Sequence, residues 1–129
     1  MSSSAPNKAK RILIAEDDPD IRALLERVLS TRYQVTLVED GTGALAKLSD
    51  PPPPHLILLD VMMPGLDGFA LARRIKLLPE VAKVPIIFIT ARDGAEDMIK
   101  GIQVGARAYI TKPFKLDAVL AKVQKALGL

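Results

Sequence analysis

Hydrophobic residues occur along this chain in two alternating patterns, and the first is a set of short runs rich in apolar residues. These runs occupy residues 11–15, 34–38, 55–60, 84–90 and 107–111. The first run is continuous up to the acids that follow it, which is typical of a parallel strand that is buried on both faces. We predict a strand in each of the five segments.

In the second pattern, apolar residues recur every three or four positions, which is the spacing of one face of an α-helix. The first such stretch follows Asp18 and Pro19, a capping acid and a proline suited to the first turn. Similar spacing predicts helices over 41–48, 67–77 and about 95–102. On a last helix the residues expected to face inward are Leu116, Val119, Leu120, Val123 and Leu127.

The alternation of strands and helices predicts an α/β fold. Because crossover connections are right-handed, five short strands favour a flavodoxin-like, doubly wound arrangement. We expect a five-stranded parallel sheet in the order 2-1-3-4-5, with helices on both faces. Residues 10–129 are expected to form one domain, preceded by a flexible N-terminal tail of residues 1–9.

Four consecutive prolines, residues 51–54, interrupt the helical pattern before the third strand. Each lacks an amide proton and blocks the preceding turn, so this segment is predicted to be a stiff connecting loop. A proline-rich ligand motif for a partner domain is the alternative. His55 follows as the single histidine of the chain, and with no partner residue indicated we interpret it as structural.

Polar residues gather just beyond the predicted strands. The first strand is followed by Glu16, Asp17 and Asp18, and the third ends in Asp60. The fourth and fifth lead into Thr90-Ala91 and Lys112. Since parallel strands place their carboxyl ends at one edge, and ligands bind there, we expect these side chains to converge.

Such a grouping favours one chemistry. Clustered carboxylates repel one another unless a cation joins them, and Mg²⁺ binds one or two carboxylates together with phosphate and water. Lys112 would offset the remaining charge and contact an added phosphoryl oxygen. The residues therefore predict phosphoryl transfer to a carboxylate, in which catalysis is largely positioning and charge neutralisation.

The composition narrows the possible partners and surroundings. Lys and Arg number 18 against 15 Asp and Glu, but the positive residues are dispersed and the chain has no Trp, which argues against direct nucleic-acid binding. No apolar stretch reaches the roughly 20 residues of a membrane helix, and the N-terminus lacks a signal-peptide pattern. The absence of cysteine excludes disulfides and is compatible with the cytoplasm, which we expect as the location.

Four segments together resemble a known family. They are residues 12–22 (ILIAEDDPDIR), 60–68 (DVMMPGLDG), 89–91 (ITA) and 105–114 (GARAYITKPF). In order and spacing they are similar to the receiver domain of two-component response regulators, in particular the single-domain chemotaxis type. The resemblance covers the chain from about residue 10 onward.

The resemblance implies a role for each matching residue. Asp60 would be the phosphoacceptor, and Asp17, Asp60 and the Met62 carbonyl would hold Mg²⁺, for which Mn²⁺ can substitute. Glu16 fills the other acidic position and would bind the metal through water. Lys112 and Thr90 would contact the phosphoryl group, and the Met62 and Ala91 amides would form a cradle for it. Thr90 and Tyr109 would be the pair of residues that switch conformation. The resemblance also implies that the Lys112–Pro113 peptide bond is cis.

The implied activity is that of a switch rather than an enzyme. A histidine kinase or histidine phosphotransfer protein would donate the phosphoryl group to Asp60, and the domain would assist its own phosphorylation and dephosphorylation. A downstream protein would read a surface made by the helix near 95–102, the strand 107–111 and the last helix. Met62 and Arg92, at positions that tune attack by water, offer no general base near neutral pH, so slow dephosphorylation is expected.

Three other functions are compatible with parts of this pattern, but each conflicts with particular residues. A flavodoxin-like cofactor binder would need a phosphate-holding loop after the first strand, where Glu16, Asp17 and Asp18 would repel a phosphate. A haloacid-dehalogenase-like phosphatase would need an acid at position 62, which is Met. A degenerate receiver used only for docking would not need the intact acid, hydroxyl and lysine positions.

Overall fold

The computed structural model describes residues 9–91, 99 and 103–129. The chain order is β1 (Arg11–Ala15), α1 (Pro19–Leu29), β2 (Gln34–Val38), α2 (Gly41–Leu48), β3 (Leu56–Asp60), α3 (Gly68–Lys76), β4 (Ile86–Ala91), β5 (Ala108–Lys112) and α5 (Leu116–Ala126). Residues 1–8 of the predicted tail, 1–9, and most of the predicted helix at 95–102 lie outside the described residues.

The five strands form one sheet in the order β2-β1-β3-β4-β5, and every neighbouring pair is parallel. The predicted fold and strand order are therefore confirmed. The strand order reverses between β1 and β3, which lie side by side at the centre, so their carboxyl ends flank the place where such sheets bind ligands.

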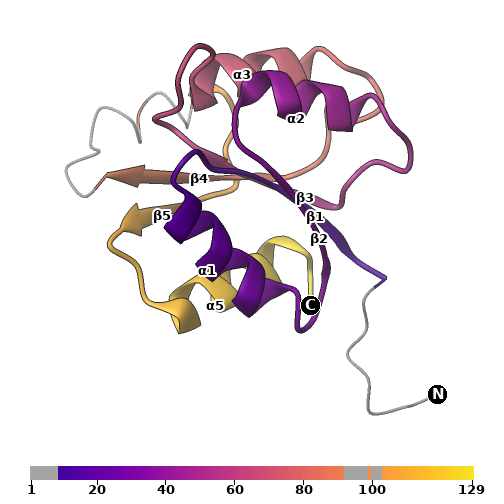
Figure 1. Ribbon diagram of the computed structural model, residues 1–129. Helices are drawn as coiled ribbons and strands as arrows, with labels where there is room; N and C mark the ends of the chain where they lie inside the picture. Colours follow the sequence, from indigo (N-terminus) through magenta and orange to yellow (C-terminus); the bar gives the residue numbers. More distant parts are fainter. Residues whose placement is uncertain (1–8, 92–98, 100–102) are drawn as a thin grey trace.

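Helices cover both faces of the sheet (Figure 1). One layer holds α2 and α3, whose Leu48 and Phe69 pack with Leu13, Ile57 and other residues of one core cluster. The other layer holds α1 and α5, which pack on the opposite face of the sheet. The central strand β3 is buried at every position, as its unbroken apolar sequence predicts.

Several strand boundaries and one helix residue differ from the predictions: β3 and β5 each start one residue later than predicted, and β4 ends one residue later. Val84 still belongs to the preceding turn, because its amide donates to Val81, and β4 starts only at Ile86. The ladder between β4 and β5 continues to the Ala91–Lys112 pair, so β5 ends one residue later than predicted. The expectation that Leu116 faces inward is wrong: it is the first residue of α5 and 36% exposed.

Three helices begin with an aspartate cap close to the carboxyl edge of the sheet. Asp18 accepts hydrogen bonds from the amides of Asp20 and Ile21, at 2.9 and 3.4 Å. Asp40 and Asp67 cap α2 and α3 in the same way. Asp18 is thus explained by helix capping, as its position before Pro19 predicts.

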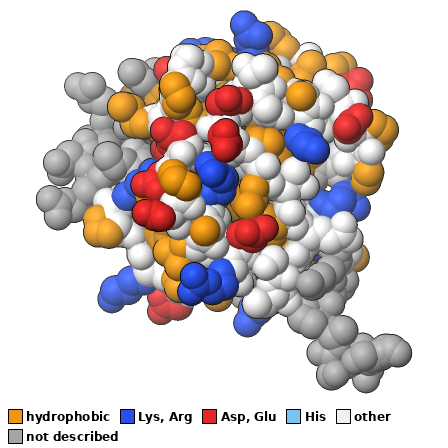
Figure 2. All heavy atoms as spheres, viewed as in Figure 1, with side chains coloured by type: hydrophobic (Ala, Val, Ile, Leu, Met, Phe, Trp, Pro, Cys, Tyr) orange, Lys and Arg blue, Asp and Glu red, His pale blue; other side chains and the backbone are white. Residues whose placement is uncertain are grey.

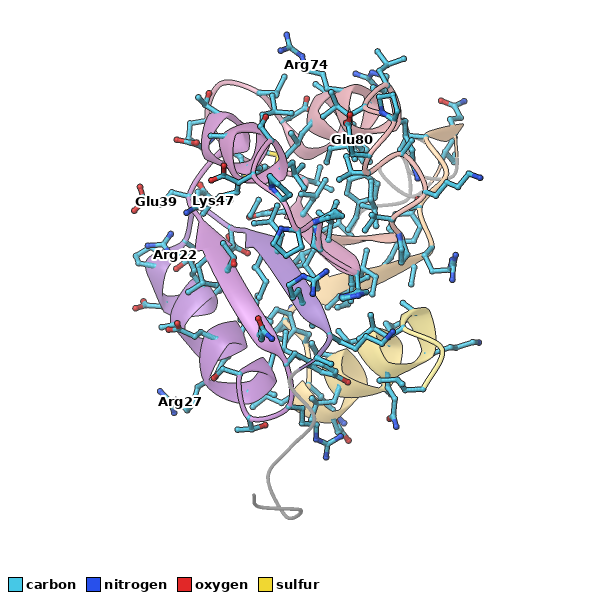
Figure 3. The ribbon with its side chains drawn as sticks, turned by 90° about the vertical axis from the view of Figure 1, so that its right-hand side faces the viewer. Arg22, Arg27, Glu39, Lys47, Arg74 and Glu80 are labelled. Atoms are coloured by element: carbon cyan, nitrogen blue, oxygen red, sulfur yellow. The ribbon has the colours of Figure 1, made fainter. Side chains whose placement is uncertain are left out.

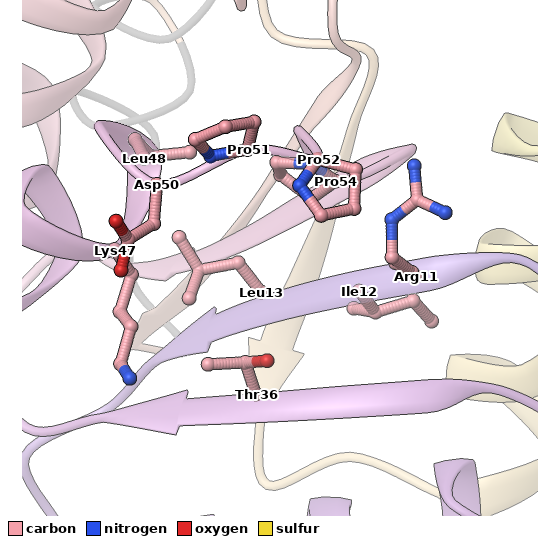
Figure 4. A pocket seen from close by; sticks show the side chains of 10 residues that line it. All are labelled: Arg11, Ile12, Leu13, Thr36, Lys47, Leu48, Asp50, Pro51, Pro52 and Pro54. Carbon is pink, nitrogen blue, oxygen red and sulfur yellow. The ribbon is translucent and has the colours of Figure 1, made fainter.

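The proline segment forms the wall of a groove at the other end of the sheet. Its floor and sides include Leu13, Thr36, Lys47 and Pro52, and its volume is about 220 Å³ (Figure 4). The Arg11 guanidinium donates to the Pro53 carbonyl at 2.8 and 3.2 Å. These bonds join the loop to β1 and support the interpretation of the prolines as a stiff connection.

His55 links the same loop to β1. Its Nδ1 accepts a hydrogen bond from the Arg11 amide at 2.9 Å, and its own amide donates to the Arg11 carbonyl at 2.8 Å. Both bonds are local to the start of the sheet, far along the strands from Asp60. The structural interpretation of His55 is therefore supported.

Acidification is expected to destabilise the protein through His55. Burial, with the positive charges of Arg11 and Lys10, lowers the pKa of His55 below its usual 6.5. The unfolded chain binds the proton first, so the free energy of unfolding falls as pH drops from 6.5 through the lowered pKa. The other groups titrate alike in the wild type and in His55→Asn, so their difference isolates the histidine. Urea unfolding should show the free energy of unfolding of the wild type falling relative to that of His55→Asn as pH drops from about 7.5 to 5.5. A difference that does not change with pH would contradict this role.

In the part of the chain that the structure describes, none of the helices has the length and apolar character required to cross a bilayer.

Candidate functional site

The predicted site residues converge at the carboxyl edge of the sheet. Asp60 is the last residue of β3 and is 2% exposed. Glu16 follows β1 directly, and Lys112 is the last residue of β5. Thr90, also 2% exposed, lies near the end of β4 and pairs in register with Thr111.

Three acids come together at this edge. Carboxylate oxygens of Glu16, Asp17 and Asp60 all lie within 4.8 Å of one another. Glu16 and Asp60 are buried, whereas Asp17 is exposed. Glu16 Oε1 is buried without a hydrogen-bond partner among the described atoms, although the Lys112 ammonium lies 3.3 Å away. A buried acceptor left in this state fits a missing cation or its bound water.

Lys112 is the positive group of the site. Its Nζ lies 3.0 Å from Asp60 Oδ2 and 3.3 Å from Glu16 Oε1. Burial by itself lowers the pKa of Lys112, but the Asp60 and Glu16 side chains more than offset this and raise it above its usual value. The lysine therefore stays protonated and offsets the charge of the acids.

Glu16 holds its proton more tightly than an exposed acid does, because its pKa is raised. The pKa of Glu16 is raised from 4.5 to about 8, chiefly by burial and also by the neighbouring Asp60, against the opposing effects of the Asp18 amide and Lys112. Desolvation disfavours a charged carboxyl unless a cation compensates it. The buried position of Glu16 thus suits a group that is ionised fully only when a divalent metal lies beside it.

Backbone amides contribute to the acceptor position. The Met62 amide donates to Asp60 Oδ1 at 3.0 Å, while the Met62 side chain is 71% exposed beside the site. Ala91, whose amide was predicted to belong to the cradle, is the last residue of β4 and pairs with Lys112 in register. The strand ladder thus brings Ala91 next to the lysine.

Tyr109 lies on the same face of the sheet as the core beneath α3. Its ring stacks on Phe88 with centroids 6.1 Å apart, and Phe88 contacts Phe69 of α3 at 4.8 Å. Burial raises the pKa of Tyr109 above 10.0. The Lys112–Pro113 bond is cis, as the resemblance implies.

Gly68, which the sequence did not single out, sits against the backbone of the acceptor. Its amide donates to the Val61 carbonyl at 3.0 Å, and a Cβ at this position would lie 2.5 Å from the Asp60 carbonyl oxygen. The start of α3 can therefore pack on Asp60 only with glycine there.

Gly68→Ala is expected to destabilise the fold by about 1–3 kcal/mol, since backbone must move to admit the methyl group. Gly43→Ala is the matched control. Gly43 also lies in the first turn of a helix, as the third residue of α2, but its nearest neighbours are 3.2 Å or more from the new Cβ and need to move by only a few tenths of an ångström. We expect the control to be neutral or stabilising because alanine favours helix. Urea unfolding measures both, and equal effects would contradict the packing argument.

The acid set fits a hard divalent cation. Mg²⁺ takes oxygen ligands in proteins, and the site offers three carboxylate oxygens. One of the carboxylates, that of Glu16, has a buried oxygen, Oε1, that accepts no hydrogen bond among the described atoms. Among the described residues the acid cluster includes neither cysteine nor histidine, which agrees with magnesium or manganese and disfavours zinc.

Known proteins are similar to this chain in sequence and in fold. Residues 12–124 match the family described as "Response regulator receiver domain". The chain is 39% identical over 115 residues to response regulator PleD of Caulobacter vibrioides, covering 88% of this chain and 25% of PleD. It is 39% identical over 118 residues to response regulator MprA of Mycobacterium avium, covering 91% of this chain and 50% of MprA. The chain thus spans a quarter to a half of these relatives.

Solved structures of response-regulator and receiver-domain proteins have a similar fold. A putative response regulator from Chloroflexus aurantiacus superposes with a TM-score of 0.88 at 31% identity, covering 95% of this chain and all of that one. The receiver domain of a sensor histidine kinase from Pseudomonas aeruginosa has a TM-score of 0.84 at 33% identity, covering 93% and 98%. That structure is described with a magnesium ion coordinated in its active-site cleft. The sequence match over most of the chain, joined to this fold, shows that the chain belongs to the receiver-domain family of response regulators.

Proposed function

We propose that the domain accepts a phosphoryl group on Asp60 in a Mg²⁺-dependent reaction. The observation that carries this proposal is the set of contacts around one buried carboxyl. Asp60 receives hydrogen bonds from Lys112 and the Met62 amide and lies within 4.8 Å of two further acids. A carboxylate held in this way can be phosphorylated only if cations offset the incoming charge.

Each residue has a definite task in the proposed reaction. Asp17, Asp60 and the Met62 carbonyl would hold the metal directly, with Glu16 acting through water. Mg²⁺, when bound, supplies positive charge to the transferring phosphoryl oxygens. The Lys112 ammonium and the Met62 and Ala91 amides contact the same oxygens, joined by the Thr90 hydroxyl.

The donor in this proposal is a phosphohistidine. An Asp60 oxygen attacks the phosphorus, the P–N bond breaks, and the imidazole leaves with its electron pair. A histidine kinase or a histidine phosphotransfer protein in the cytoplasm would supply the donor. The chain would serve as a switch that assists its own phosphorylation and dephosphorylation, with Mn²⁺ able to replace Mg²⁺.

Intact-mass measurement after incubation with acetyl phosphate tests this function. We expect one added phosphoryl group in the wild type with Mg²⁺ and none with EDTA or in Asp60→Ala. Asp50→Ala is the matched control, because Asp50 is an exposed acid at the opposite end of the sheet. Equal phosphorylation of the wild type and Asp60→Ala would reject the acceptor assignment.

Dephosphorylation is expected to be slow. The Met62 side chain beside Asp60 has no group that can deprotonate or orient a water molecule. Arg92, the second residue that we expect to tune this step, lies outside the described residues. Phosphate release should be faster in a double variant, Met62→Asn with Arg92→Glu, than in the wild type. A slower double variant would show that these positions do not limit attack by water.

The proposed output is a change of protein surface. A phosphoryl group on Asp60 offers the Thr90 hydroxyl a charge-assisted hydrogen bond, and Tyr109 turns into the space that Thr90 leaves. The surface formed by β5, α5 and the helix predicted at 95–102 would then present a new face to a downstream protein. Exposed Arg107, Lys115, Lys122 and Lys125 favour an acidic partner.

Beryllofluoride, a phosphoryl mimic, tests the output by NMR. Shifts at Tyr109 and along α5 are expected, and shifts confined to the metal loops would contradict the switch. Nucleic acid is not the proposed target: on the face in Figure 2, Lys and Arg side chains are dispersed among acidic and apolar ones.

A further inference from the structure

Arg22 joins α1 to the acidic loop that precedes it. Its Nη1 donates to the Glu16 carbonyl at 2.8 Å and lies 3.4 Å from the Asp17 carbonyl. Its Nη2 lies 3.6 Å from Glu39 Oε1, just beyond β2. Figure 3 shows Arg22 and Glu39 side by side at this end of β2. One guanidinium therefore spans the backbone of both acids and the neighbouring strand end.

Helix stability does not account for this arginine. Arg22 is close to the start of α1, where the positive end of the helix dipole disfavours a cation. The ion pair with Glu39 is long, and Glu39 is 75% exposed, so this pair contributes little. The short bond to the Glu16 carbonyl, made by a side chain only 19% exposed, is the strongest contact that Arg22 has.

The contact between Arg22 and the Glu16 carbonyl affects the orientation of the Glu16 and Asp17 side chains. With their carbonyls held toward Arg22, Glu16 and Asp17 turn their side chains toward Asp60, where the carboxylate oxygens meet. From the other side, the Asp18 amide donates to Glu16 Oε2 at 3.1 Å. The loop is thus fixed through both its carbonyls and its buried carboxyl.

We propose that Arg22 is a positioning residue that holds the Glu16–Asp17 loop in the geometry needed to bind a divalent metal. This inference rests on the proposed function, because the metal is part of it. Arg22 does not touch the metal or the phosphoryl group. It acts through the backbone of the two acids, as partners outside the metal ligands commonly do.

If Arg22 acts only through its charge, replacing it should change Mg²⁺ affinity in the opposite direction from that expected if it positions the loop. A nearby cation repels Mg²⁺, so if Arg22 acted only by its charge, removing that charge would tighten metal binding. If Arg22 positions the loop, its removal weakens binding. Lysine separates the two effects, because it keeps the charge but lacks the planar guanidinium whose Nη1 contacts both carbonyls while Nη2 faces Glu39.

Calorimetric titration of the metal-free domain with Mg²⁺ tests the proposal. We expect Arg22→Lys and Arg22→Gln each to bind Mg²⁺ about tenfold more weakly than the wild type. Glu39→Gln is the control, since it removes the ion pair and leaves the carbonyl contacts, and it should stay within about twofold. Wild-type affinity in Arg22→Lys with tighter binding in Arg22→Gln would overturn the proposal. Thermal melting verifies that each variant is folded.

A second measurement needs no metal. In the metal-free domain, ¹⁵N relaxation should show the Glu16, Asp17 and Asp18 amides losing order in both Arg22 variants, from about 0.85 toward 0.6 in order parameter. Unchanged order parameters would overturn the positioning role. If the wild type failed to bind Mg²⁺ at all, the proposed metal site would be rejected, while relaxation would still decide what Arg22 does to the loop.

Discussion

Lys112→Ala is expected to lower the rate of phosphoryl transfer to Asp60 by about a hundredfold, the cost of losing one preorganised contact to the developing charge. The ammonium lies 3.0 Å from Asp60 Oδ2 and 3.3 Å from Glu16 Oε1, so it is already directed at the acceptor before any donor arrives. Stopped-flow or quench-flow measurement with acetyl phosphate and saturating Mg²⁺ gives the rate.

Metal affinity should change in the opposite direction. Removing a cation from beside the acids lessens repulsion of Mg²⁺, so Lys112→Ala is expected to bind Mg²⁺ as tightly as the wild type or more tightly. Lys115→Ala, three residues along and exposed, is the control and should change neither quantity. A Lys112→Ala variant that is phosphorylated at the wild-type rate would contradict the role of this lysine.

Glu16→Gln is expected to weaken Mg²⁺ binding by about tenfold while stabilising the metal-free protein at alkaline pH. The gain in stability follows from burial: Glu16 is fully buried, and its pKa is raised from 4.5 to about 8. Glutamine keeps the shape and the hydrogen-bonding oxygen but carries no charge to desolvate.

The sign of the pH effect follows from proton binding. Between about pH 4.5 and 8 the unfolded chain has lost the Glu16 proton and the folded protein retains it, so the free energy of unfolding falls as pH rises through this range. The lowered pKa of His55 acts only below 6.5, which leaves pH 6.5 to 8 for Glu16. Urea unfolding in EDTA should show this fall in the wild type and not in Glu16→Gln. Parallel curves would contradict it.

The sheet and the convergence of the site could be predicted from the sequence because both depend on strong, local signals. Short runs rich in apolar residues marked the strands, and parallel strands necessarily bring their carboxyl ends to one edge. Asp60 and Lys112 therefore approach each other although 52 residues separate them. The aspartate cap at Asp18 followed from its place before Pro19.

Features that depend on backbone contacts could not be predicted in the same way. Arg22 has the pattern of an exposed helix residue, and its partners are carbonyls that every residue possesses. The requirement for Gly68 arises from the closeness of α3 to the Asp60 carbonyl, which is a tertiary distance. Leu116 fits the helical spacing, but it is the first residue of α5 and is not covered by the core.

Chemical trapping of the phosphorylated residue tests the central claim most directly. Borohydride reduces an aspartyl phosphate to homoserine, and peptide mass mapping then locates the reduced residue. With a phosphodonor and Mg²⁺ present, we expect homoserine at position 60 alone, and none when EDTA replaces Mg²⁺. Homoserine at another aspartate, or trapping at position 60 that is equal with and without the metal, would contradict the account.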